Sequence, residues 1–173
     1  MTDPLSWIRE KDCYITPGYI IEQVARVSTT GMIGLDPCAG KNTQHATVNW
    51  CLPETGIDGL SNPWVGHGLV FCNPPYSPGN LARWSKKCAL ESDLGAEVIG
   101  LMPASTGAKW MFEWVYPYAS AICWLSGRVV FIDPCTLKKS KQSGFMWSAL
   151  IYWGDHPKRF AKRVSLGQMT LLS

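Results

Sequence analysis

Residues 70–76 constrain the fold of this chain more than any other stretch. The run 70–72 is apolar and favours a buried strand, and it continues into Asn73, Pro74, Pro75 and Tyr76. Because two successive prolines cannot donate hydrogen bonds to a sheet, the strand has to end in a stiff turn. Ligands of open α/β sheets bind at the carboxyl ends of strands. The amide, the proline-fixed carbonyl and the phenol ring of this turn suit a planar molecule that carries an amino group.

A second strand with a polar ending lies upstream. Residues 32–35 favour a short buried strand, which runs into Asp36, Pro37, Cys38, Ala39 and Gly40. Small residues let the backbone approach a ligand closely, and a carboxylate can bind hydroxyl groups or a cation. The pattern is therefore typical of nucleotide-type sites, although turns with Asp, Pro and Gly also occur in ordinary loops.

Apolar strands alternate with helical patterns along the chain, which predicts an α/β fold. One helix is expected to begin with Thr16 as N-cap and Pro17 at the first helical position. Strands 121–132 and 145–153 are joined without a helix, so they should be antiparallel neighbours. We therefore expect a mostly parallel sheet with one antiparallel strand near its C-terminal edge. A short basic helix should follow, and no linker divides residues 1–173, so one domain is expected.

Composition narrows the class of protein. A hydrophobic fraction of 46% and a charged fraction of 17% exclude a disordered chain. There is no apolar run of membrane-spanning length and no signal-peptide pattern, so we expect a cytoplasmic protein. The seven cysteines are odd in number and none are spaced as CxxC, which favours a reduced protein without a metal site.

Positive charge is unevenly distributed, although the net charge is only +3. Basic residues cluster at 138–141 and again at 158–163, and the chain contains nine tryptophans, which can stack on nucleobases as well as fill a core. Basic loops among aromatic residues are a weak indication of nucleic-acid binding.

The Asp36–Gly40 loop followed by Asn73–Tyr76 resembles the signature pair of amino-methyltransferases that use S-adenosylmethionine. The chain is most similar to the phage-type DNA N6-adenine methyltransferases, the Dam-like family of phages and prophages. Most of the chain takes part in this resemblance, through residues 14–17, 58–61, 71–76, 106–110 and 148–154. It implies a compact class I methyltransferase fold, which is Rossmann-like. It also implies transfer of a methyl group from S-adenosylmethionine to N6 of adenine in double-stranded DNA.

The resemblance also implies roles for individual residues. Asn73 and the Pro74 carbonyl would accept hydrogen bonds from the adenine amino group, Pro75 would complete the motif, and Tyr76 would stack on the flipped-out base. The cofactor-binding residues implied are Tyr14, Thr16, Pro17, Asp36, Pro37, Cys38, Ala39, Gly40, Asp58 and Leu60.

Recognition of DNA would have to come from loops, because the chain has no room for a separate target-recognition domain. The loops 105–110 and 134–144 are the candidates, and the phosphate-contact candidates are Lys109, Lys138, Lys139 and Lys141. A monomer or a weak dimer is expected. If the chain is encoded by a phage, its location would be the cytoplasm of the bacterial host, with a role in protection from restriction or in regulation.

The sequence departs from the family pattern in the second half of the cofactor site. No acid clearly ends the second strand to bind the ribose, so Asn49 and Glu54 are both candidates, and Asn42 stands where a glycine is common. The sequence leaves open a methyltransferase for adenine or guanine in RNA or for protein glutamine. A catalytically inactive DNA-binding remnant is a further alternative.

Overall fold

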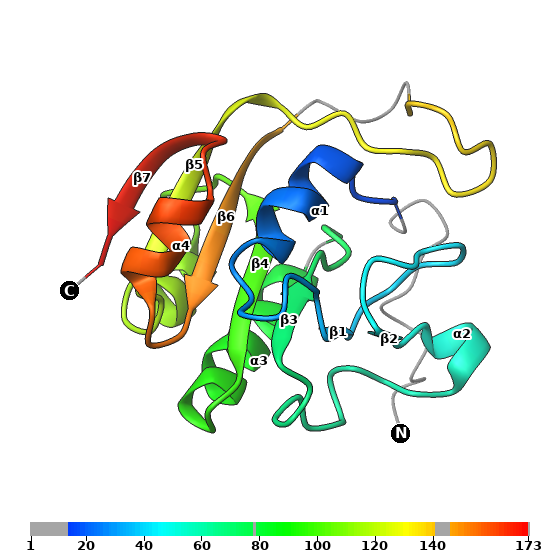
Figure 1. The fold of residues 1–173 in the computed structure, drawn as a ribbon, viewed down its shortest axis with the longest axis horizontal. Helices are drawn as coiled ribbons and strands as arrows, with labels where there is room; N and C mark the ends of the chain where they lie inside the picture. Colours follow the sequence, from blue (N-terminus) through cyan, green and yellow to red (C-terminus); the bar gives the residue numbers. More distant parts are fainter. Residues whose placement is uncertain (1–13, 78, 141–145, 173) are drawn as a thin grey trace.

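The computed structural model describes residues 14–77, 79–140 and 146–172. Within this part the chain forms one seven-stranded sheet with the strand order β2-β1-β3-β4-β6-β5-β7 (Figure 1). The strands are β1 (Leu35–Asp36), β2 (Val48–Asn49), β3 (Leu69–Cys72), β4 (Glu97–Pro103), β5 (Ala121–Arg128), β6 (Trp147–Trp153) and β7 (Gly167–Leu171). The predicted α/β class is confirmed.

The sheet has a parallel half and an antiparallel half. β1 pairs in parallel with β2 and β3, and β3 with β4. β6 lies antiparallel between β4 and β5, and β7 pairs antiparallel with β5. The predicted antiparallel neighbours β5 and β6 are therefore confirmed, but the prediction of a single antiparallel strand is wrong. β7 escaped prediction because it is an edge strand with exposed side chains on both faces, so it lacks apolar alternation.

Helices cover both faces of the sheet. α1 (Gly18–Ala25) and α4 (Pro157–Arg163) lie in front of it in Figure 1, and α3 (Asn80–Asp93) lies behind it. The short helix α2 (Leu52–Thr55) follows β2, and a π-helix, η2 (Met111–Val115), follows β4. The predicted basic helix is α4, and its N-cap is His156.

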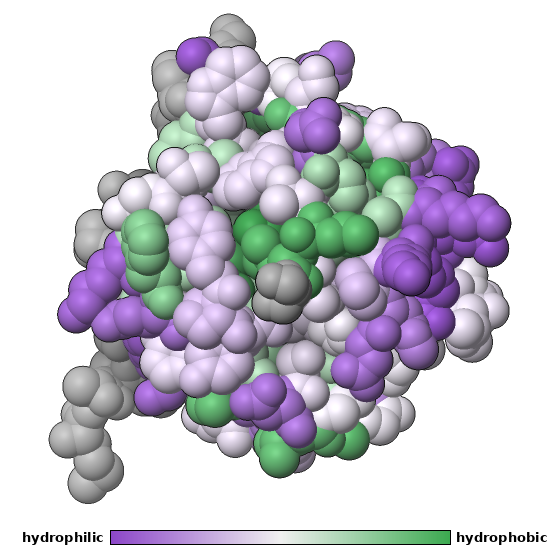
Figure 2. Space-filling view, turned by 90° about the vertical axis from the view of Figure 1, so that its left-hand side faces the viewer, coloured by the Kyte–Doolittle hydropathy of each residue, from purple (hydrophilic) through white to green (hydrophobic). Residues whose placement is uncertain are grey.

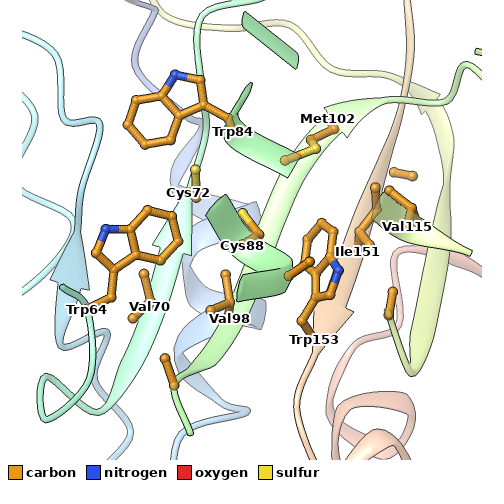
Figure 3. Close-up of a cluster of buried hydrophobic side chains, with 14 of the residues drawn as sticks. Trp64, Val70, Cys72, Trp84, Cys88, Val98, Met102, Val115, Ile151 and Trp153 are labelled. Carbon is orange, nitrogen blue, oxygen red and sulfur yellow. The ribbon is translucent and has the colours of Figure 1, made fainter. Parts of the chain in front are cut away.

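Two hydrophobic cores follow from this arrangement, one on each face. Successive residues of β3 alternate between them, since Val70 and Cys72 belong to one core and Phe71 to the other. Figure 3 shows the first core, where Trp64 and Trp84 pack beside β3. The second core includes residues of α1 and α4. Because both faces are covered, the central strands are continuous apolar runs.

β7 leaves one edge of the sheet open within the described residues. Its side chains are exposed apart from the partly buried Met169. Figure 2 views the molecule from this side, where hydrophobic groups gather near the middle of the view and hydrophilic groups lie to the right. This side is therefore mixed in character and not uniformly basic.

Two local predictions need correction. α1 begins at Gly18, and its N-cap is Pro17 in an extended conformation, so Thr16 is not the N-cap. The Thr16 hydroxyl instead accepts a hydrogen bond from the Asn73 side chain. The expected strand 121–132 ends at Arg128, where its register with β6 shifts and Gly127 takes a φ of 78°. Glycine adopts this left-handed conformation without steric cost.

Candidate active site

The two polar strand endings predicted from the sequence lie side by side. β1 and β3 are parallel neighbours, with Leu35 opposite Val70, so Asp36 at the end of β1 lies beside the turn after β3. The loop after β1 also touches that turn, since the Sγ atoms of Cys38 and Cys72 are 3.5 Å apart. In addition, the Cys38 sulfur accepts a hydrogen bond from the Asn73 backbone N–H. The Asp36–Gly40 loop and the Asn73–Tyr76 turn are therefore in direct contact.

Asp36 is a buried carboxylate, with only 3% of its surface exposed. Its Oδ1 accepts a hydrogen bond of 3.1 Å from the Cys38 backbone N–H. Burial raises the pKa of Asp36 to about 7, although that hydrogen bond acts in the opposite direction. No Lys or Arg forms an ion pair with Asp36 in the described part of the chain. The site therefore offers a buried acid to a positively charged ligand.

The other residues of the predicted cofactor loop are buried or half-buried. Pro37 and Ala39 are buried, and the Gly40 carbonyl accepts a hydrogen bond from Thr43 N–H. Asn42, at the position where the family pattern has glycine, takes a φ of 63° and donates from Nδ2 to the Pro134 carbonyl. Asparagine tolerates this conformation better than most residues. The loop thus keeps the bend that a glycine would give.

The Asp58–Leu60 turn packs against the loop after β1. A Cβ atom on Gly59 would overlap the Pro37 carbonyl oxygen, so only glycine fits at this contact. Asp58 accepts hydrogen bonds from Leu60 N–H through Oδ1 and from the Ser61 hydroxyl through Oδ2. The turn thus lies beside Pro37, the neighbour of Asp36, and both Asp58 oxygens stabilise the turn itself.

Trp64 fixes the Asp58–Leu60 turn to the rest of the fold, a role that the sequence did not reveal. Its indole Nε1 donates to the Gly59 carbonyl at 2.8 Å, and its backbone N–H donates to Glu91 on α3 at 2.7 Å. The ring stacks on Trp84, also on α3, with centroids 6.2 Å apart (Figure 3). α3 therefore positions one side of the cofactor region.

The Asn73 side chain is oriented by the segment that precedes α1. Its Nδ2 donates to Thr16 Oγ1 at 3.1 Å and to the Tyr14 carbonyl at 3.5 Å. Since these contacts use the amide nitrogen, the amide oxygen is left as the acceptor for a ligand. Tyr14 and Thr16, which were predicted to close over a cofactor, thus contact Asn73, the predicted catalytic residue.

Tyr76 is anchored at the carboxyl end of β4. Its hydroxyl donates to the Leu101 carbonyl at 3.0 Å, and burial raises its pKa, so the phenol stays neutral. Phe131 contacts the ring edge-on at a centroid distance of 6.3 Å, and it also contacts Tyr14 at 6.2 Å. Phe131 was missed as a site residue because it occurs in an apolar run that reads as strand. Pro74 and Pro75 are buried.

The predicted phosphate-binding lysines fall into two groups. Lys138 and Lys139 are exposed, and Lys139 pairs through its backbone with Ile132, which itself pairs with Ile15. Lys109 is also exposed, but its Nζ lies 3.3 Å from the carboxylate of Glu113. Lys141 lies outside the described residues. Through these two backbone pairings, Lys138 and Lys139 lie near the segment that contains Tyr14.

The two candidates for the ribose-binding residue differ in their surroundings. Asn49 closes its own loop, since its Nδ2 donates to the Ala46 carbonyl and its Oδ1 accepts from Ala46 N–H. Glu54 is exposed on α2. Its carboxylate also contributes, after burial, to the raised pKa of the Cys51 thiol. Both candidates therefore have a local partner, and they differ in exposure, since Glu54 is exposed and Asn49 is half-buried.

Two further findings concern other classes of site. The described residues contain no helix long and apolar enough to cross a membrane. In the same part of the chain, no group of three or more His, Cys, Asp or Glu side chains is arranged to hold a metal ion.

Comparison with known proteins assigns the chain to a family. The model of the family described as DNA N-6-adenine-methyltransferase (Dam) matches residues 6–170. No curated protein and no solved structure matches the chain. None of these findings favours RNA, protein glutamine or an inactive remnant. The chain therefore belongs to the Dam family of DNA N6-adenine methyltransferases, and its function is the methylation of adenine N6 in DNA.

Proposed function

We propose that S-adenosylmethionine is the methyl donor and that the target adenine binds at Asn73–Tyr76, in a fold of the class I methyltransferase type. The observation that carries this proposal is the orientation of Asn73. Its amide nitrogen donates to Thr16 and Tyr14. Its oxygen is therefore directed to accept from an amino group, as adenine N6 requires.

The residues around Asp36 fit such a donor. A sulfonium ligand with an amino group is cationic, and Asp36 is a buried carboxylate without an ion pair in the described part. Tyr14, Thr16 and Pro17 would contact the donor from the segment that touches Asn73, and Asp58 and Leu60 would contact it from the turn that touches Pro37. The backbone of Pro37, Cys38, Ala39 and Gly40 would hold the remainder of the ligand. When bound, the donor supplies an already activated methyl group.

The protein then mainly has to position the adenine. Asn73 Oδ1 and the Pro74 carbonyl would accept the two amino hydrogens, which aligns the nitrogen with the methyl group. Tyr76 would stack on the adenine. The adenine would be turned out of the duplex, because the enzyme cannot reach the adenine amino group inside the base stack. Its hydroxyl is held by Leu101, so the ring serves as a surface and not as a base. No general base is required if the proton leaves after the transfer.

The ribose of the donor would be bound by Glu54 in preference to Asn49. Asn49 uses both ends of its amide on Ala46, whereas Glu54 follows the carboxyl end of β2 on the short helix α2. A carboxylate at this end of the sheet suits two ribose hydroxyl groups. Glu54→Gln should therefore weaken donor binding more than Asn49→Ser, as measured by calorimetry.

The substrate would be double-stranded DNA, contacted through Lys109, Lys138, Lys139 and Lys141. Residues 1–173 would form a single catalytic domain without a separate target-recognition domain. Site choice would then come from the loops 105–110 and 134–144. The expected location is the cytoplasm, that of a bacterial host if the protein is of the phage type. The protein would act as a monomer or a weak dimer.

The test is transfer of a labelled methyl group from S-adenosylmethionine to unmethylated duplex DNA. We expect label on adenine N6, and Asn73→Ala should lower the rate at least a hundredfold. Gln168→Ala, another amide deletion, lies on the exposed strand β7 and should leave the rate unchanged. Label recovered in RNA or in glutamine peptides, and none in DNA adenine, would refute the proposed substrate.

A further inference from the structure

Trp147 differs from the other tryptophans of the described chain. It is 55% exposed, whereas the remaining seven described tryptophans are buried or half-buried. Its backbone is held firmly, because β6 pairs with β4 on one side and with β5 on the other. The indole therefore extends into solvent from a strand that is paired on both sides. Packing in the core does not explain why a tryptophan stands at this position.

Arg128 completes a pair with Trp147. Its guanidinium carbon lies 5.3 Å from the centroid of the Trp147 ring, within the range of a cation–π contact. The two residues face each other in the register of β5 and β6. Arg128 is exposed, and no carboxylate forms an ion pair with it among the described residues. Its charge is thus available to an external anion.

The pair lies at the same end of the strands as the candidate active site. The Trp147 carbonyl accepts a hydrogen bond of 2.8 Å from Ala104, which directly follows β4. β4 also anchors Tyr76 through the Leu101 carbonyl. From Arg128 the chain runs within three residues to Phe131, which touches Tyr76. Both partners are therefore connected to the Asn73–Tyr76 turn through neighbouring strand ends.

We propose that Arg128 and Trp147 form a DNA-contact pair. Trp147 stacks on a base of the duplex near the extruded adenine, and Arg128 binds a backbone phosphate while holding the indole in place. Exposed aromatic rings stack on bases without regard to sequence, and a guanidinium binds phosphate in a matching geometry. The location of the adenine in this inference rests on the proposed function. The pair is assigned to positioning of the DNA and not to the chemical step.

The stacking contact is tested by pairing protein and DNA changes. Sequencing of methylated DNA gives the target site, and short duplexes with a single abasic position are then scanned across that site and its flanks. We expect Trp147→Ala to weaken binding of the intact duplex about tenfold, with Trp147→Phe close to the wild type. At one abasic position, wild type and Trp147→Ala should bind equally, because the base on which the indole stacks is missing there. Equal weakening by Trp147→Ala at every position would overturn the stacking role.

The phosphate contact is tested by the salt dependence of binding. Arg128→Ala should lower the slope of log affinity against log salt by about one, since one fewer phosphate is neutralised. Arg128→Lys should keep the slope. An unchanged slope for Arg128→Ala would overturn the phosphate contact. Arg26→Ala is the control for Arg128→Ala, and Tyr118→Ala is the control for Trp147→Ala. Arg26 directly follows α1, and Tyr118 lies three residues before the start of β5, so neither belongs to the end of β5 or the start of β6.

Two further measurements distinguish failure of the proposed DNA-contact pair from misfolding of a variant and from failure of the proposed function. If Trp147→Ala does not fold, Trp147→Leu keeps an apolar side chain without an aromatic face and should give the same loss at the same abasic position. If the wild type transfers no methyl group, the proposed function fails. The salt slope of Arg128→Ala on duplex DNA of arbitrary sequence still decides whether the pair contacts DNA.

Discussion

Single side chains set the chemistry of this site, and Asp36 and Asn73 are the clearest cases. Asp36 is kept in a buried position where the neutral acid is favoured, and its pKa rises to about 7. Asn73 is oriented by two acceptors on the segment before α1, so its amide oxygen is left as the acceptor for the proposed substrate. The Asn73 contacts join residues far apart in sequence, and the shift of Asp36 comes from burial in the folded protein, so neither effect can be read from the motif itself.

The raised pKa of Asp36 predicts pH-dependent binding of the donor. Below a pH of about 7 the carboxyl is protonated in the free protein, so binding of a cationic ligand must release a proton. The dissociation constant of S-adenosylmethionine should therefore fall about tenfold between pH 6 and pH 8. Calorimetry across this range measures it. Asp36→Asn should bind more weakly, with little dependence on pH, and an identical pH profile for the two proteins would contradict the prediction.

The same shift predicts an effect on the stability of the ligand-free protein. The pKa of Asp36 is higher in the folded state than its ordinary value of 3.8, so the folded state binds more protons between the two values. The contribution of Asp36 to the free energy of unfolding therefore decreases as pH rises from about 4 to about 7, by at most about 4 kcal/mol. Urea unfolding of wild type and Asp36→Asn should show a difference that grows in favour of the variant over this range. A constant difference would count against a buried, protonated Asp36.

Gly59 predicts a steric effect at the same scale. A Cβ at this position would overlap the Pro37 carbonyl, so Gly59→Ala should push the Asp58 turn away from the Asp36 loop. We expect a loss of about 2 kcal/mol in the free energy of unfolding, together with weaker donor binding. Gly18→Ala is the matched control, because nothing lies within 4 Å of its Cβ position. Equal stability of the two variants, measured by urea unfolding, would show that the two loops can separate freely.

At the scale of elements, the central strands were predictable from the sequence, whereas the short helix α2 and the edge strand β7 were not. β3 and β4 are buried on both faces, so their apolar runs stand out in the sequence. A helix is expected around residues 110–118, where the π-helix η2 lies, but α2 is only four residues long, too short for a helical period to appear. The sequence predicts Thr16 as the N-cap of α1 because threonine is a common cap. Its hydroxyl instead accepts a hydrogen bond from Asn73, which follows β3.

The link between α3 and the Asp58 turn gives an element-scale prediction. Trp64 is fully buried, stacks on Trp84 and donates to Gly59. Trp64→Ala should therefore cost about 3–5 kcal/mol, through a cavity and a lost hydrogen bond. Trp64→Phe keeps most of the ring and should cost clearly less. Chemical denaturation measures both, and a smaller loss for Ala than for Phe would contradict this role of Trp64.

At the scale of the whole molecule, the strand order places the candidate site at the carboxyl ends of the parallel strands. The ends of β1, β3 and β4 lie together because these strands are parallel neighbours. Ile132 pairs through its backbone with both Ile15 and Lys139, so the exposed Lys138 and Lys139 lie near the segment that contains Tyr14. The lateral edge of the sheet at β7 carries mixed hydrophobic and hydrophilic groups (Figure 2). A net charge of only +3 is therefore compatible with a local basic face.

This arrangement predicts how binding of duplex DNA responds to salt. Lys139→Ala should reduce the slope of log affinity against log salt by about one. Lys109→Ala should reduce it less, because Lys109 already lies beside the Glu113 carboxylate. Fluorescence anisotropy at several salt concentrations measures both slopes. A larger change for Lys109→Ala would place the phosphate backbone along the 105–110 loop.

The sequence by itself determined the two strand endings, the α/β class, the β5–β6 neighbours and, through its family match, the methylation of adenine in DNA. These features rest on local patterns, since buried runs, prolines and motif spacing are visible along the chain. Only the tertiary structure decided the partner of Thr16, the contact of Gly59 with Pro37, the anchoring by Trp64 and the Arg128–Trp147 pair. Those depend on strand order and on the second antiparallel strand, which bring together residues that no local pattern relates.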